Sequence, residues 1–183
     1  MKALLIKYNS VIKFILTFLI VYFSLSVAYK FYLDFSNGSK YYPDYFTNLV
    51  AKQSQILLNE IGYNTQIAPH PNEPSIKLIV NNKYLARVIE GCNGISVIIL
   101  FIAFIIAFSG KLKTTILYIL VGSVLIYIIN LIRIVILTLG LYHYPWHKEV
   151  LHAVIFPSII YGMVFLLWMY WVNQCSNLKK KND

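Results

Sequence analysis

The chain has 183 residues, of which 58% are hydrophobic and 16% aromatic, and its mean hydropathy is +0.65. These values exclude an ordinary soluble domain and are typical of an integral membrane protein. The formal net charge of +9 is expected to reflect membrane topology and contact with anionic lipid, because no surface of interleaved basic and aromatic residues is present. We therefore predict membrane lipid, and no nucleic acid, as a partner.

Four apolar stretches are long enough to predict transmembrane helices, since crossing a hydrocarbon core takes about 20 helical residues. They cover about residues 11–32, 90–108, 115–139 and 150–172. We predict an all-α integral membrane protein with a single membrane domain over residues 1–183. A cleaved signal peptide is the alternative interpretation of the first stretch, because Ser26-Val27-Ala28 resembles a cleavage site. The long apolar region favours an uncleaved anchor.

The lysines that flank these stretches predict both termini in the cytoplasm. Basic residues precede the first span, separate the second span from the third at Lys111 and Lys113, and follow the fourth span in the tail 173–183. With four spans, all three clusters lie on one side of the membrane. The long loop of about residues 34–88 and a short loop at residues 142–149 are then extracytoplasmic.

The long loop is predicted to contain secondary structure. Apolar residues recur at helical spacing within residues 45–61, which predicts an amphipathic helix able to lie on the bilayer surface. These residues are Phe46, Leu49, Val50, Leu57 and Ile61. Alternating residues at 76–80, a turn at Asn81-Asn82 and a second stretch at 84–89 predict a short β-hairpin. The hairpin leads directly into a turn that contains a cysteine.

Three residues with complementary chemistry fall at the extracytoplasmic ends of successive spans. Cys92 lies in the turn Glu90-Gly91-Cys92-Asn93-Gly94, where a thiol is accessible and can form a thiolate. Arg133 is the only charged residue of the third span, and about 30 Å of helix separates it from Lys113. His152 opens the fourth span. A thiol, a cation and an imidazole are the parts of a cysteine transpeptidase or protease.

Each of these residues also has a structural interpretation. Arg133 could reach lipid headgroups or pair with a carboxylate between helices. Glu90 could orient His152 or neutralise Arg133, or it could be a favourable residue near a helix N-terminus. Asn93 and Asn130 are secondary candidates, because their side-chain amides could orient the other groups.

Metal and nucleotide chemistry have little support in the sequence. His143, His147 and His152, together with Cys92, could in principle supply zinc ligands, but we do not predict a zinc site from them. No glycine-rich phosphate loop is present. A disulfide between Cys92 and Cys175 is disfavoured, because about 30 Å of bilayer is predicted to separate them. We therefore predict no cofactor and no metal.

These residues resemble the motifs of the exosortase and archaeosortase family, and the sequence is most similar to its short F-type bacterial members. The resemblance runs from Glu90-Gly91-Cys92-Asn93-Gly94-Ile95-Ser96 through Asn130-Leu131-Ile132-Arg133 to His152 and Tyr161-Gly162. It implies a multi-pass transpeptidase of the bacterial inner membrane with an extracytoplasmic active site. Cys92 would be the nucleophile, Arg133 the partner of the thiolate or oxyanion, and His152 the proton-transfer residue.

The resemblance also implies substrates and partners. Secreted proteins with a C-terminal sorting tail, made of a short motif, an apolar helix and a basic end, would be cleaved and passed to a lipid or glycan acceptor. The chain departs from many members in having Asn93 where they have serine, and in having fewer spans. A non-enzymatic membrane assembly factor is one alternative function. A transporter-like bundle with Arg133 on an anion path is another.

Overall fold

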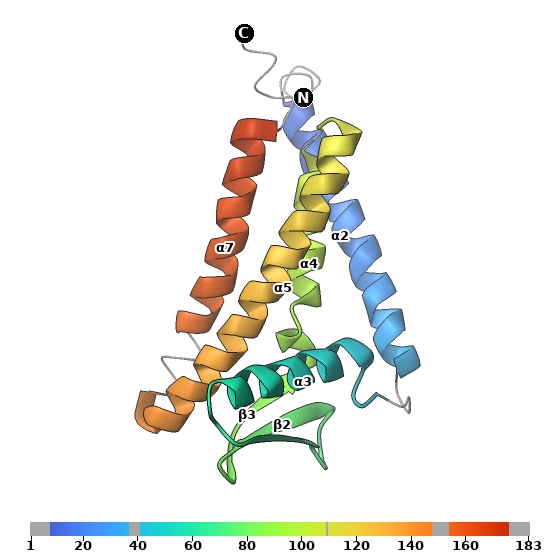
Figure 1. Cartoon of the computed structure of the whole chain (residues 1–183). Helices are drawn as coiled ribbons and strands as arrows, with labels where there is room; N and C mark the ends of the chain where they lie inside the picture. The colour runs from blue at the N-terminus through green and yellow to red at the C-terminus, as the bar shows by residue number, and fades with distance from the viewer. Residues whose placement is uncertain (1–7, 37–40, 109, 148–153, 176–183) are drawn as a thin grey trace.

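The computed structural model describes residues 8–36, 41–108, 110–147 and 154–175. The helices α2, α4, α5 and α7 run roughly along one direction and form a bundle (Figure 1). The helix α3 lies across one end of this bundle, next to a small sheet. α2 begins and α7 ends at the opposite end, so the bundle has a bare end and a covered end.

The two longest helices are apolar enough to cross a membrane. α2 covers Asn9–Ser36 and α5 covers Leu112–His143. Their 28 and 32 residues correspond to about 42 and 48 Å. Both extend beyond the stretches expected from hydropathy. No residue of α2 is buried, and Phe23 is 70% exposed, which gives the helix an apolar surface of the kind that lipid covers.

The second predicted span, residues 90–108, is only partly α-helical. Glu90–Cys92 forms a 3₁₀ turn, η1, and α4 covers Ile95–Ala107. Gly94 separates them with a φ of 86°, a left-handed conformation that glycine adopts readily. With 13 residues, α4 is about 20 Å long and therefore shorter than the hydrocarbon core of a typical bilayer.

The described part of the fourth predicted span, residues 150–172, begins at residue 154. α7 covers Phe156–Tyr170 and continues into a π-helical turn, η4, at Trp171–Cys175. Pro157 lies in the first turn of α7, where a missing N–H removes no hydrogen bond from the helix. Pro157 is therefore compatible with the start of this helix.

α4, α5 and α7 enclose a hydrophobic core. Its buried members are Phe101, Ile105, Ile126, Ile160, Val164 and Trp171. Gly122 of α5 permits the close approach of α4, because a Cβ atom at this position would lie 2.4 Å from Cζ of Phe101. α2 packs on α4 from outside, with the rings of Phe14 and Phe108 4.4 Å apart.

The expected amphipathic helix is found as α3, Tyr45–Glu60, and its N-cap Asp44 accepts a hydrogen bond from the Thr47 N–H at 3.0 Å. Its buried face differs from the predicted one, because Leu57 is 38% exposed and Ile61, which follows the helix, is 57% exposed. The buried residues are Thr47, Val50, Ala51, Ser54 and Leu58. This face rests on the sheet and on α5 instead of on lipid. Its small and hydroxyl-bearing side chains allow that close contact.

The sheet has three antiparallel strands in the order β1-β2-β3. The expected hairpin is found as β2, Ser75–Val80, and β3, Lys83–Ile89. Asn81 and Asn82 both have positive φ, as a tight two-residue turn requires. β1, Thr65–Pro69, was not expected, so the prediction of an all-α fold with only a hairpin is corrected to a helical fold with a three-stranded sheet.

The sheet, α3 and the end of α5 share a second hydrophobic core. Its buried members are Val50, Ala51, Ile76, Leu78, Val88 and Ile134. Cys92 packs against this core. The turn that carries the cysteine is therefore supported at the junction between the bundle and the layer that covers its end.

A candidate active site at the covered end of the bundle

Cys92 and Arg133 line one cavity of about 170 Å³. The other lining residues are Leu78, Ala86, Arg87, Gly91, Ile134, Leu137 and Pro157. The cavity therefore lies between the cysteine turn, the sheet, α5 and the first turn of α7. Two residues that the sequence analysis selected from different spans meet at this place.

The backbone of Cys92 is held by α5. Asn130, which is 1% exposed, donates a hydrogen bond from its side-chain amide to the carbonyl oxygen of Cys92 at 2.9 Å. Gly94 lies directly against this amide, since a Cβ atom at Gly94 would be 3.2 Å from Nδ2 of Asn130. The bundle thus fixes the position of a free, partly buried cysteine.

Asn93 holds the same turn from the other side. Its side chain is fully buried and donates to the hydroxyl of Tyr29 at 2.7 Å and to Oγ1 of Thr47 at 3.2 Å. Its amide oxygen accepts a hydrogen bond from the N–H of Ile95, the first residue of α4, at 2.9 Å. Asn93 therefore joins the cysteine turn to α2, α3 and α4.

The charged residues that line the cavity are both arginines. Arg87 of β3 pairs with Glu73. Arg133 is partly buried, and within the described part of the chain no carboxylate pairs with it and no hydrogen bond to its side chain is found. Arg133 is thus a cation on the cavity wall that has no carboxylate partner among the described residues.

Glu90 and His152 do not join this arrangement in the described structure. Glu90 is exposed and lines a separate cavity of about 180 Å³ with Asp34 and Asp44, so it is not placed beside Arg133. His152 lies outside the described residues. Pro157, five positions later in the chain, does line the cysteine cavity.

The described residues contain no group of three histidine, cysteine or carboxylate side chains arranged to hold a metal ion. His143, one of the three histidines considered from the sequence, instead has its Nε2 atom 2.8 Å from the hydroxyl of Tyr63. It thereby connects the end of α5 to the segment after α3.

Arg87 and Leu137 are cavity residues that the sequence analysis missed. Arg87 is one of several basic residues in the long loop, and its residue type alone does not distinguish it from the others. The signal that could have selected it is its place on β3, five residues before Cys92 on the strand that leads into the turn. Leu137 lies four residues after Arg133, on the same face of a helix.

The fold and the cavity define a class: a bundle of apolar helices in which a cysteine and an arginine line one cavity at the covered end. The profile of the transmembrane exosortase family (Exosortase_EpsH) matches residues 4–172, which is most of the chain. The protein belongs to this family, which confirms the resemblance found in its sequence and assigns it to membrane proteins of transpeptidase type. No curated protein and no solved structure matches the chain significantly.

Proposed function

We propose that the protein is a membrane-embedded cysteine transpeptidase that cleaves C-terminal sorting signals of secreted proteins at the extracytoplasmic face of the bacterial plasma membrane. The observation that carries this proposal is the cavity shared by Cys92 and Arg133 in a member of the exosortase family. A thiol and a guanidinium on the wall of one cavity, the guanidinium without a carboxylate partner among the described residues, suit nucleophilic attack on a carbonyl group.

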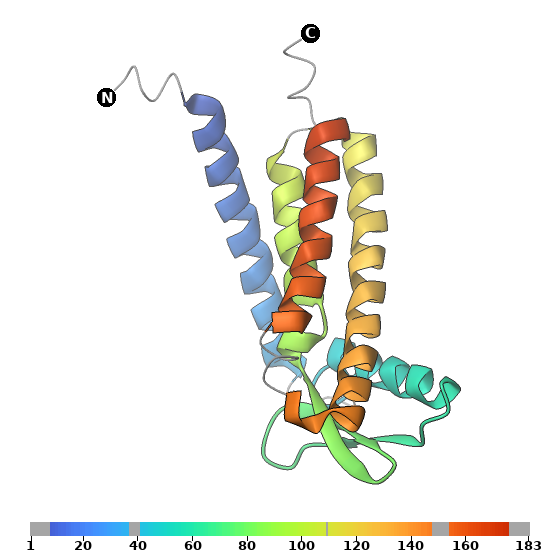
Figure 2. The same ribbon diagram turned by 90° about the vertical axis from the view of Figure 1, so that its left-hand side faces the viewer.

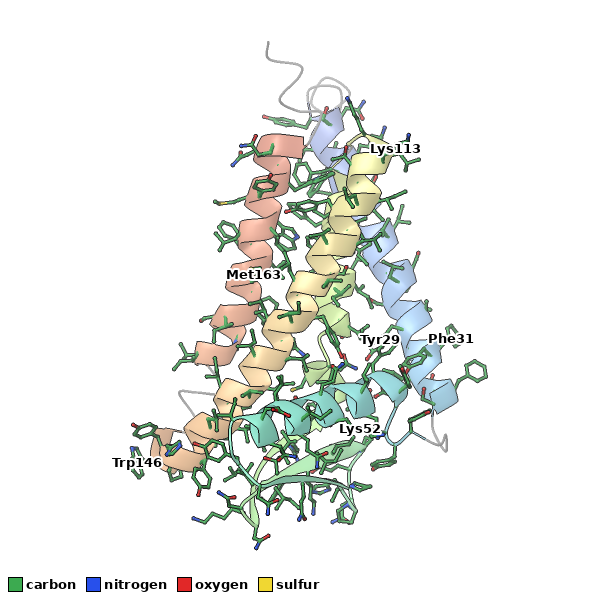
Figure 3. All side chains as sticks on the ribbon, in the orientation of Figure 1. Tyr29, Phe31, Lys52, Lys113, Trp146 and Met163 are labelled. Atoms are coloured by element: carbon green, nitrogen blue, oxygen red, sulfur yellow. The ribbon has the colours of Figure 1, made fainter. Side chains whose placement is uncertain are left out.

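For this assignment we infer a topology with four spans. α4 and α7 run alongside the longer α5 in two perpendicular views (Figure 2). Lys113 lies at the bare end of the bundle, whereas Lys52 and Trp146 lie at the covered end (Figure 3). Short basic segments favour the cytoplasm, so we place the bare end inside and the cavity outside.

In the proposed reaction, the Cys92 thiolate attacks the carbonyl carbon of the scissile peptide bond. The guanidinium of Arg133 stabilises first the thiolate and then the oxyanion of the tetrahedral intermediate. The C–N bond breaks, the leaving amine takes up the proton that the thiol released, and a thioester on Cys92 remains. A lipid or glycan nucleophile, or water, then attacks the thioester and restores the thiol. We assign the proton transfer to His152, as its place in the family motif implies.

Replacement of Cys92 tests the proposal. A secreted reporter is given a C-terminal tail with a motif, an apolar helix and a basic end, taken from a protein of the same organism, and its processing is followed in cells. Cys92→Ala is expected to leave the precursor uncut while the variant still inserts into the membrane. Cys175→Ala is the matched control, because Cys175 lies at the far end of η4 and should have no role in processing.

Normal processing by an inserted Cys92→Ala protein would overturn the catalytic assignment. Full function of Cys92→Ser would favour the non-enzymatic assembly factor, because a serine hydroxyl can preserve packing but forms an anion far less readily than a thiol.

A further inference from the structure

β3 has a free edge beside the cysteine cavity. It is the last strand in the order β1-β2-β3, and no other described segment pairs with its second side. The strand ends at Ile89 and continues directly into the turn of Cys92. An unpaired edge offers a row of backbone N–H and C=O groups to another extended chain.

The pairing of the sheet indicates which backbone groups of β3 are free. Pro69 lies opposite Ile76 and has no N–H, and the adjacent His70 N–H donates to the Ser75 carbonyl oxygen at 2.9 Å. Hydrogen-bonded and non-hydrogen-bonded pairs alternate along an antiparallel ladder. The backbone groups of Ile76 therefore point toward β3, where Ile76 lies opposite Val88.

The same alternation applies along β3. Because Val88 directs its backbone groups to β2, Arg87 directs its N–H and C=O groups to the free edge, and Ile89 directs its N–H there. The Ile89 carbonyl belongs to the 3₁₀ turn that follows. A register irregularity at Leu78 and Ile79 leaves Leu85 as an extra residue on β3. The regular part of the free edge thus runs from Ala86 to Ile89, the half of the strand nearest to Cys92.

A larger cavity of about 570 Å³ adjoins the cysteine cavity. Both cavities are lined by Ala86, Arg87 and Leu137. The larger one also contacts Tyr84 and Leu85, so it is lined by four consecutive residues of β3. Side chains of a strand alternate between its two faces. Because Ala86 and Arg87 lie on opposite faces of the strand, the larger cavity reaches the edge of β3, and it extends to His70, which follows β1.

We propose that the polypeptide substrate binds as an added strand along the free edge of β3, with its backbone paired to Arg87 and Ile89 and its scissile carbonyl presented to Cys92. This rests on the proposed function, since it is the binding mode of that substrate. An extended peptide is the occupant that fits, because it supplies the backbone donors and acceptors that the edge lacks. The larger cavity then receives side chains on one side of the scissile bond.

A proline at position 87 tests the backbone contact. Arg87→Ala removes the guanidinium but keeps the outward N–H, whereas Arg87→Pro removes both and leaves the pairing with β2 intact. We expect Arg87→Pro to process the tail-bearing reporter about 3- to 10-fold more slowly than Arg87→Ala, the loss expected for one hydrogen bond. Membrane levels and the thermal unfolding midpoint of the two variants are compared as the folding control. Equal rates for two folded variants would overturn the proposal.

Disulfide mapping tests the binding mode without a proline. In a Cys92→Ala, Cys175→Ala chain, a single cysteine is placed at Tyr84 or Arg87, and single cysteines are placed at successive positions of the reporter tail. Strand addition predicts cross-links at every second tail position, because alternate side chains face opposite sides. Uniform cross-linking, or none, would overturn the proposed binding mode. Cross-links at every second tail position, together with a tail that the chain with its native cysteines leaves uncut, would support the binding mode. The same result would overturn the proposed enzymatic function.

Discussion

The side-chain amide of Asn130 donates a hydrogen bond to the carbonyl oxygen of Cys92 at 2.9 Å. This contact spans 38 positions of the chain and joins the middle of a long apolar helix to the turn before a different one. The candidate nucleophile is therefore positioned through its backbone, at the wall of the cavity that it shares with Arg133.

Loss of this hydrogen bond should destabilise the protein. Asn130→Ala leaves the Cys92 carbonyl without its donor in a buried place, which should lower the free energy of unfolding by about 1 to 3 kcal/mol. Thermal unfolding of the purified protein in detergent measures the effect. Ser123→Ala is the matched control, because the buried Ser123 hydroxyl on the same helix has no hydrogen-bond partner within the described structure. Equal losses from both substitutions would contradict the role of Asn130.

Gly94→Ala should disturb the site more than the same change at Gly62. Both glycines have positive φ, 86° and 98°, which costs an L-residue about 1 to 2 kcal/mol. A Cβ atom at Gly94 also meets the Asn130 amide at 3.2 Å, whereas nothing lies within 4 Å of one at Gly62. Reporter processing should therefore fall only for Gly94→Ala. Equal processing by the two variants would show that the contact with Asn130 is unimportant.

Asn93 and Tyr29 should be energetically coupled. Their side chains form a hydrogen bond of 2.7 Å that links the cysteine turn to α2. A double-mutant cycle of Asn93→Ala and Tyr29→Phe is expected to give an interaction free energy of about 0.5 to 3 kcal/mol. The same cycle with Tyr22→Phe, two turns earlier on α2, should be additive. Additivity in both cycles would contradict a role for this bond in stability.

Gly122→Ala should overpack the bundle. The added methyl group would lie 2.4 Å from Cζ of Phe101, and such insertions cost about 1 to 3 kcal/mol. Phe101→Leu in the same chain should recover part of the lost stability, because it removes the ring from that contact. Gly162→Ala, which meets no atom within 4 Å, is the control and should not destabilise the protein. Thermal unfolding in detergent distinguishes these outcomes.

Arg133→Gln separates a chemical role from a structural one. If the guanidinium stabilises an oxyanion, its loss should slow reporter processing about 100- to 1000-fold while membrane levels stay normal. If Arg133 only anchors the helix to lipid headgroups, we expect the reverse result. The variant should then be less abundant in the membrane, and the protein that is present should process the reporter at the normal rate. Lys113→Gln, at the far end of the same helix, should leave the processing rate unchanged.

Hydropathy could predict the long helices, but their ends depend on contacts that it does not describe. α4 starts late because Gly94 adopts a left-handed conformation against Asn130. α5 continues past its apolar stretch because its last turn packs on the segment after α3, where His143 meets Tyr63. β1 is five residues long and ends in Pro69, so it carries too little alternation to be recognised.

The shared location of Cys92 and Arg133 could be predicted because the start of one helix and the last part of the next, antiparallel helix lie at the same end of a bundle. The rest of the cavity wall could not be predicted, because the approach of β3 to α5 is a tertiary contact that no local sequence pattern indicates. The same holds for Glu90, which the 3₁₀ turn directs toward the acidic cavity at the end of α2. Sequence distance from the cysteine is therefore a poor guide to membership of the site.

One face of α5 carries four residues at three- and four-residue intervals: Asn130, Arg133, Ile134 and Leu137. The partner of the Cys92 carbonyl and three residues of the cavity wall therefore share a single helical phase. Far from the site, Tyr118 fixes that phase by donating from its hydroxyl to the Leu167 carbonyl oxygen of α7 at 2.7 Å. One residue inserted between these two points would turn the whole face by about 100° relative to Tyr118. The number of residues in this apolar stretch is therefore as much a determinant of the cavity as the side chains that line it.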